Sequence, residues 1–273
     1  MLDIINDFLA YDFLKKALIV GLLVALSASL LGVSLVLKRF SMIGDGLSHV
    51  GFGAISIAAA LNIAPLKLSI PIVVIAAFLL LKLSQNSKIN GDAAIALISS
   101  SALAIGVFIN SLSTNIKSDL STYMFGSILA ISNDDLIISI ILSFVVISLF
   151  ILFYNKIFSI TFDEAFSSAT GINSDFYNML IALLTAITTV IGMRLMGALL
   201  MSSLLIFPSL SSMRICKSFK SVVISSAIFS SVCFIVGLAL SYKIFTPAGS
   251  TIVIINLALF LISFIIGKLF KKS

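Results

Sequence analysis

The sequence predicts an all-α integral membrane protein, a polytopic bundle of eight or nine transmembrane helices that forms one domain over residues 1–273. Hydrophobic residues make up 60% of the chain and charged residues 10%, with a mean hydropathy of +1.24, which excludes an ordinary soluble globule. The apolar residues come in blocks of about 15 to 25, the length of membrane-spanning helices, whereas outer-membrane barrels alternate over about ten residues. We therefore expect a multi-pass protein of the cell membrane.

Four apolar segments predict the spans of the first half of the chain. They cover residues 17–37, 45–61, 68–81 and 92–110. Lys38 and Arg39 end the first span, and Pro65 supplies a turn signal after the second. Residues 111–133 then break the pattern. Their apolar piece, 123–131, is too short to cross a bilayer, so we expect a re-entrant or surface helix there.

Five further apolar segments predict the spans of the second half. They run from Asp134 to Tyr154, over 176–193, from Gly197 to near Pro208 and Ser212, over 220–241, and from Pro247 to Lys268. Positive charge gathers on the cytoplasmic side of membrane proteins. Placing the C-terminal lysines inside also places four basic connections inside, namely 38–39, 82–91, 155–175 and 214–220. Nine spans leave the N-terminus outside, which Lys15 and Lys16 oppose, so either the first dozen residues lie in an interface or one span does not cross.

The charges and cysteines exclude several kinds of function. The net charge of +6 comes from Lys and Arg near segment ends, where they set topology, so we expect a lipid membrane and no nucleic acid as partner. Cys216 and Cys233 belong to no Cys-x-x-Cys or Cys/His cluster and are predicted to be free thiols. The chain has no G-x-x-x-x-G-K-[ST] phosphate loop, so energy for uphill transport must come from another subunit.

The stretch 44–49 holds the candidate site. It combines His49, the only histidine, with Asp45 four positions earlier. Residues four apart on a helix project from the same face, so the carboxylate and the imidazole can hold one cation. An oxygen and a nitrogen donor suit zinc, manganese, iron or nickel. The alternative is structural, with Asp45 as the helix N-cap and His49 as its hydrogen-bond partner.

The connection 155–175 holds a second candidate, a short cytoplasmic helix. Thr161 and Glu164 have the spacing of a capping box, and Gly171 lies where a C-terminal cap glycine belongs, which predicts about two turns. The apolar stripe comprises Phe162, Ala165, Phe166 and Ala169, and the polar face holds Asp163, Glu164 and Ser168. An acidic face favours a protein partner, and a helix resting on the membrane surface is the alternative.

Four stretches of this chain together resemble a known family. They are 43–49, 162–172, 192–208 and 247–252, in the family's order and at suitable spacing. Over nearly its whole length the chain resembles the membrane permease subunits of ABC-type zinc and manganese uptake transporters. One departure concerns the first stretch, where Gly46 follows Asp45 in place of the familiar Ala, and Gly51 and Gly53 follow the histidine. These extra glycines allow a closer approach of neighbouring backbones.

The resemblance implies a permease homodimer, two cytoplasmic ATPase subunits and an extracytoplasmic metal-binding protein. It implies that Asp45 and His49 line the path of the transported zinc or manganese ion, with no covalently bound cofactor and no enzyme activity in this chain. The helix that it implies for coupling to the ATPase carries Phe162, Asp163, Glu164, Phe166 and Gly171. We therefore expect an ATP-driven importer of a divalent transition metal, zinc first and manganese second.

Two other transport functions and one enzymatic function are the alternatives. A proton-coupled secondary cation transporter also uses Asp and His inside a helix bundle. A permease for a metal chelate would need a wide apolar path in place of an ion-sized charged pair. An intramembrane enzyme is the least favoured, because Ser48 and His49 are adjacent and point about 100° apart on a helix, too far for a nucleophile and its base.

Overall fold

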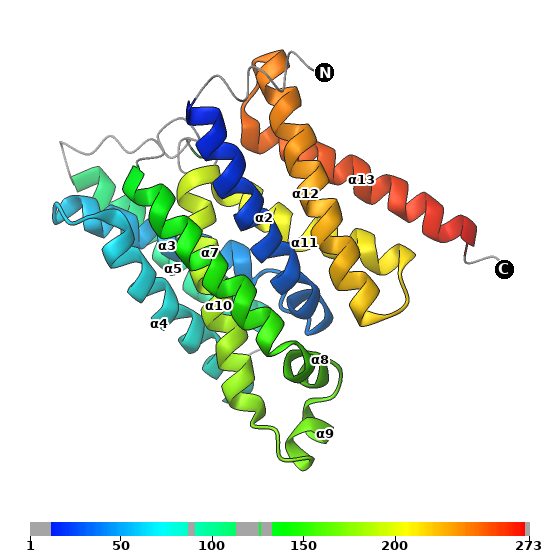
Figure 1. Cartoon of the computed structure of the whole chain (residues 1–273). Coiled ribbons are helices and arrows are strands. Elements are labelled where there is room, and N and C mark those ends of the chain that lie inside the picture. The colour runs from blue at the N-terminus through cyan, green and yellow to red at the C-terminus, as the bar shows by residue number, and fades with distance from the viewer. Residues whose placement is uncertain (1–11, 87–90, 113–125, 127–132, 271–273) are drawn as a thin grey trace.

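The computed structural model describes residues 12–86, 91–112, 126 and 133–270, and every regular element within them is an α-helix (Figure 1). The helices are α2 (Asp12–Leu37), α3 (Ile43–Ala60), α4 (Pro65–Asn86), α5 (Gly91–Leu112), α7 (Asn133–Leu152), α8 (Tyr154–Phe162), α9 (Glu164–Ala169), α10 (Ser174–Met196), α11 (Ala198–Ile215), α12 (Phe219–Ile244) and α13 (Ala248–Phe270). All but α8 and α9 run through the body of the bundle. The all-α membrane fold is thus confirmed.

Eight of the described helices are long and apolar enough to cross a membrane, and α7 with α8 forms a further pair bent by 68°. The most buried spans are α2 and α10, and the most exposed are α5 and α13. Figure 1 shows this order, with α4 and α5 on one flank of the bundle and α13 on the other. The core therefore lies around α2 and α10, and the outer helices are those that contact lipid or other chains.

Two contacts show that α7 also passes from one end of the bundle to the other. The ammonium of Lys16, near the start of α2, donates to Asn133 at the start of α7 over 2.7 Å. The ammonium of Lys38, just beyond the end of α2, is 3.1 Å from a carboxylate oxygen of Glu164, which begins α9. The segment from α7 to α9 therefore runs between the same two ends of the bundle as α2. With the bent pair α7–α8 counted as one span, the described helices make nine spans.

The basic connections gather at the end that holds α8 and α9. Tyr154 and Phe219 place the start of α8 against the start of α12, with ring centroids 5.6 Å apart. The end of α13 lies against the end of α11, because a Cβ added to Gly267 would be 2.8 Å from the Arg214 carbonyl oxygen. The expectation that these connections share one side of the membrane agrees with this arrangement.

Several predicted boundaries were wrong, and proline is the main reason. We expected spans 68–81 and 197–212, but α4 begins at Pro65 and contains Pro71, and α11 continues through Pro208 to Ile215. Proline interrupts isolated helices, yet neighbouring helices in a membrane compensate for the lost hydrogen bond. The span expected to end at Tyr154 stops at Leu152, where α8 turns away. The expected surface piece 123–131 and the first dozen residues lie outside the described residues, apart from Gly126 and Asp12.

Candidate functional site

Asp45 lies inside the first turn of α3 and does not cap it. The helix begins at Ile43, and its N-cap residue is Met42, which makes no side-chain capping bond. The capping role that the structural alternative gives Asp45 is therefore wrong, and its carboxylate is directed at the side chains of His49 and Ser202 instead. The short connection from α2 is itself hydrogen-bonded, with the Phe40 N–H donating to Leu35 and the Ile43 N–H donating to Phe40.

The carboxylate of Asp45 faces the imidazole of His49, as the spacing predicts. Asp45 Oδ2 and His49 Nε2 are 3.5 Å apart. Two ligand atoms on a tetrahedral zinc, with metal distances of about 2.0–2.2 Å, lie about 3.4 Å from each other. The pair is therefore spaced so that an ion could be held between its two atoms with little side-chain movement.

Both side chains of this pair are partly exposed, and His49 has an unused ring nitrogen. The exposed fraction is 27% for the His49 side chain and 38% for the Asp45 side chain, so neither is sealed inside this chain. Among the described residues, the buried Nδ1 atom of His49 has no hydrogen-bond partner. The described residues contain no group of three or more His, Cys, Asp or Glu side chains able to hold a metal. The pair thus supplies two donors, and the remaining positions around an ion must be filled from elsewhere.

Ser202 is a third member of this site that sequence reasoning missed. It lies on α11, and its hydroxyl is 3.2 Å from Asp45 Oδ1 and 3.3 Å from the Ala198 carbonyl oxygen. Serine is common in these spans, and nothing in the pattern marks one that lies 157 positions from Asp45. Gly197, with a φ of 90°, makes the turn between α10 and α11 that brings Ser202 to α3.

The glycines of α3 hold the pair close to its neighbours. A Cβ at Gly46 would lie 2.7 Å from Ile95 Cγ2, and one at Gly53 would lie 2.7 Å from the Ala102 carbonyl oxygen, both on α5. At Gly53 a side chain would press on the backbone of α5, and at Gly46 it would displace the Ile95 side chain. The expected close approach is therefore confirmed at the positions where this chain departs from the familiar pattern.

The predicted cytoplasmic helix exists, but its start differs from the expected capping box. The N-cap of α9 is Asp163, whose Oδ1 accepts the Phe166 N–H over 2.8 Å. Thr161 belongs to α8, and its hydroxyl donates to the Ile157 carbonyl oxygen instead. The capping box was wrong because Asp163, two positions after Thr161, offers the stronger local acceptor.

The end of α9 is the one that Gly171 predicts. Its φ is +84°, the Ile172 N–H donates to the Ser167 carbonyl oxygen, and the Gly171 N–H donates to that of Ser168. This pair of bonds is the Schellman ending, which favours glycine. Gly171 therefore stops the helix after six residues.

The expected coupling residues separate into two groups. Phe162 and Phe166 present 61% and 62% of their surface, an exposed apolar pair at the end of the bundle where α8 and α9 lie. Glu164 is directed the other way, toward Lys38 and Asn178. The two phenylalanines are thus available to a partner, and Glu164 is engaged with the bundle.

Comparisons with known proteins agree with this arrangement. The chain is 32% identical to the high-affinity zinc uptake system membrane protein ZnuB of Haemophilus influenzae, over 96% of this chain and 99% of that protein. It is 29% identical to the manganese import system permease protein ScaB of Streptococcus gordonii, over 94% and 92%. One chain in the structure of PsaBC from Streptococcus pneumoniae in complex with Fab has a TM-score of 0.85 and 29% identity, over 96% of this chain and 95% of that chain. The sequence profile of the ABC 3 transport family matches residues 10–267, and the chain therefore belongs to this family.

Proposed function

We propose that this chain is the channel-forming permease subunit of an ATP-driven importer of divalent transition metal ions, zinc first and manganese second. The observation that carries the proposal is the Asp45–His49 pair, whose facing atoms are 3.5 Å apart at the start of a buried span. Membership of the ABC 3 transport family and relatives named for zinc and for manganese support it. The whole chain acts as one transmembrane permease domain.

The energy and the delivery of the ion come from other subunits. A separate cytoplasmic ATPase hydrolyses ATP and docks on the exposed Phe162 and Phe166, and an extracytoplasmic protein delivers the metal. A second copy of this chain completes the channel as a homodimer. The two donors of one chain support this arrangement, because a transition metal needs four or more ligands.

The pair serves transport because it is incomplete and partly exposed. The carboxylate offsets one of the two charges of the ion in a poorly polar path, and the imidazole contributes a nitrogen that alkali metals do not favour. A closed cage of four protein ligands would retain the ion, as structural zinc sites do. Two donors with open positions let the ion bind in passing and leave.

The alternatives are less well supported by the same residues. A proton-coupled secondary transporter would need its own relay of titratable groups, whereas the described residues show one Asp–His pair and no larger cluster. A chelate permease would need a path wide enough for a bulky ligand. The structure of a metal-chelate type ABC transporter in an inward-facing conformation is similar at a TM-score of 0.76 and 15% identity, a likeness that shows the fold alone.

Uptake by Asp45→Asn and His49→Gln variants tests the proposal. Asparagine keeps a hydrogen-bond acceptor for Ser202 but removes the charge that offsets the ion, and glutamine is a poor transition-metal ligand. We expect each change to cost about 3 kcal/mol of ion stabilisation, roughly a hundredfold in affinity. The measurement is uptake of labelled zinc and manganese into vesicles that contain the permease with its ATPase and metal-binding subunits.

The matched control is Asp92→Asn, which removes an exposed carboxylate from the first turn of α5. Its uptake should stay at the wild-type level. Near wild-type uptake of both metals by Asp45→Asn and His49→Gln would refute the metal path. Metal uptake by the wild-type permease without the ATPase, with a proton gradient as the only energy source, would favour the secondary transporter.

A further inference from the structure

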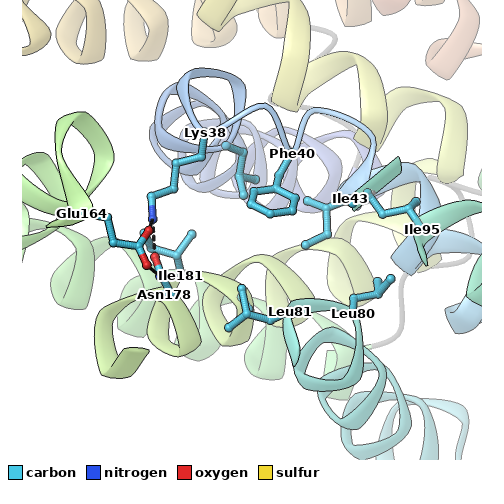
Figure 2. Close-up of a pocket in the computed structure, with 12 residues that line it drawn as sticks. Lys38, Phe40, Ile43, Leu80, Leu81, Ile95, Glu164, Asn178 and Ile181 are labelled. Atoms are coloured by element: carbon cyan, nitrogen blue, oxygen red, sulfur yellow. Dashed lines mark hydrogen bonds and ion pairs between the residues drawn. The ribbon is translucent and has the colours of Figure 1, made fainter. Parts of the chain in front are cut away.

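Three polar side chains meet where α9 approaches the body of the bundle. The ammonium of Lys38 is 3.1 Å from Glu164 Oε2 and also donates to Asn178 Oδ1. The Asn178 amide N–H in turn donates to Glu164 Oε1 over 2.9 Å. Figure 2 shows the Lys38 side chain extended toward the other two. Each of the three side chains contacts both of the others, so they form a closed triad.

The triad joins three elements at points where the chain changes direction. Lys38 follows the last residue of α2, Glu164 is the first residue of α9, and Asn178 lies on α10. Only residues 38–42 separate α2 from α3, and Met42 is the N-cap of α3. A displacement of Lys38 therefore acts five residues before Ile43, the first residue of the helix that carries Asp45.

The remaining hydrogen bonds of α9 do not reach α2 or α3. The Ser167 hydroxyl pairs with Ser159 of α8, and the Ser168 hydroxyl pairs with Ser174 of α10, each over 2.7 Å. Within α9 only Ser167 is buried. Apolar packing thus does little to fix α9 in place. The bond from Lys38 to Glu164 is what links it to the end of α2.

The burial of Lys38 favours movements in which it stays paired with Glu164. Its side chain is 12% exposed, so its charge has little water to turn to if a partner leaves. A largely buried cation that loses its carboxylate is strongly disfavoured, because the desolvation cost then stands without compensation. When α9 moves, the arrangement of lowest free energy is therefore the one in which Lys38 follows Glu164.

A cavity beside the triad supplies room for such movement. Its volume is about 220 Å³, and it is lined on one side by the triad and on the other by Leu80, Leu81 and Ile95 from α4 and α5. Figure 2 shows that Phe40, from the α2–α3 connection, and Ile43, the first residue of α3, also line it. Protein interiors are close-packed, so a space of this size is where side chains and helix ends can shift without a clash.

We propose that Lys38, Glu164 and Asn178 form a coupling joint, a set of positioning residues that transmits displacement of the docking helix α9 to α3 and so to the metal pair. The joint rests on the proposed function, since it needs an ATPase that moves α9. It assigns Glu164 a role inside this chain, distinct from the contact that Phe162 and Phe166 offer to the ATPase.

The test compares zinc uptake per ATP hydrolysed in the reconstituted complex of permease, ATPase and metal-binding subunit. Glu164→Gln and Lys38→Met should bind the ATPase at wild-type stoichiometry and hydrolyse ATP, yet take up about tenfold less zinc per ATP. The exchanged variant Lys38→Glu/Glu164→Lys should regain much of the loss. The control Asp175→Asn removes an exposed carboxylate from the same end of α10 and should leave the ratio unchanged.

Two results of this experiment would overturn the joint. One is an unchanged ratio of zinc to ATP in both single variants. The other is loss of ATPase binding by Glu164→Gln, which would make Glu164 a docking residue.

A second measurement tests the coupling joint by a distance between spin labels and does not depend on transport. Spin labels at Met42→Cys and Ala169→Cys, with Cys216 and Cys233 replaced by Ser, report the distance between α3 and α9. In the wild-type complex this distance should hold when ATP is added, because the two ends move together, whereas with Lys38→Met it should change. Equal behaviour of the two proteins would overturn the joint. A wild-type complex that hydrolyses ATP and imports neither metal would refute the proposed function alone, since the labels still report on the joint.

Discussion

The Asp45 carboxylate has both of its oxygens engaged, one toward His49 and the other toward the Ser202 hydroxyl. A hydrogen bond from a neighbouring helix fixes the direction of a carboxylate before an ion arrives. Groups that orient metal ligands in this way contribute about 10- to 100-fold to metal affinity. Ser202 therefore belongs to the site by its effect on Asp45, although a hydroxyl is a weak ligand by itself.

We predict that Ser202→Ala raises the zinc concentration for half-maximal uptake about tenfold, because Asp45 loses its fixed orientation. The maximal rate should change little, since both donors remain. Ser202→Thr, which keeps the hydroxyl, should restore the affinity. Ser203→Ala is the matched control, because the Ser203 hydroxyl has no hydrogen-bond partner among the described residues. Equal concentration dependence of the two alanine variants would show that Ser202 is structural.

At the scale of single residues, the sequence predicted what depends on local spacing. Asp45 and His49 are one helical turn apart, and Gly171 is the residue that a Schellman ending favours. Ser202 and Lys38 could not be predicted, because their partners are distant in sequence and many serines and lysines are equivalent in pattern. Glu164 was predicted as a coupling residue, but its direction toward the bundle needed the fold.

At the scale of elements, α9 is a helix held at both ends and nearly unpacked between them. Asp163 caps its start, Gly171 ends it, and Phe166 lies on its exposed face. The sequence predicted this helix from its apolar stripe and its glycine, but it placed the start two residues too early and included Phe162, which is the last residue of α8. It predicted the ends of α4 and α11 less well, since proline stops helices in water but is tolerated inside a membrane bundle.

We predict that Phe166→Asp abolishes copurification of the ATPase while the permease still inserts and folds. A charge at the centre of an apolar contact is desolvated without a partner, which costs several kcal/mol. The cap of α9 survives the change, because the bond to Asp163 uses the Phe166 backbone N–H. Phe166→Leu, which keeps an apolar side chain, is the control and should retain the ATPase. Copurification with Phe166→Asp would place the docking surface elsewhere.

At the scale of the whole molecule, two long-range contacts decide what hydropathy alone left open. The sequence allowed eight or nine spans, because a bent pair such as α7 and α8 can be a broken span or a re-entrant loop. The contact between Lys16 and Asn133 places the start of α2 beside the start of α7. The contact between Lys38 and Glu164 places the end of α2 beside α9, which follows α7 and α8 in the chain. The bent pair α7–α8 therefore counts as one span, which makes nine and puts the start of α2 and the end of α13 on opposite sides of the membrane.

We predict this topology for single cysteines introduced after Cys216 and Cys233 are replaced by Ser. A membrane-impermeant maleimide added to intact cells should label Asp12→Cys and Ile63→Cys, which lie at the end of the bundle away from α9. It should label Ala169→Cys and Lys268→Cys only after permeabilisation, because the positive-inside rule places the basic connections in the cytoplasm. Eight crossings would instead bring Asp12 and Lys268 to the same side, so labelling of both in intact cells, or of neither, would refute the crossing by α7. The opposite pattern at all four positions would leave nine crossings but invert them, and α9 could then no longer meet a cytoplasmic ATPase.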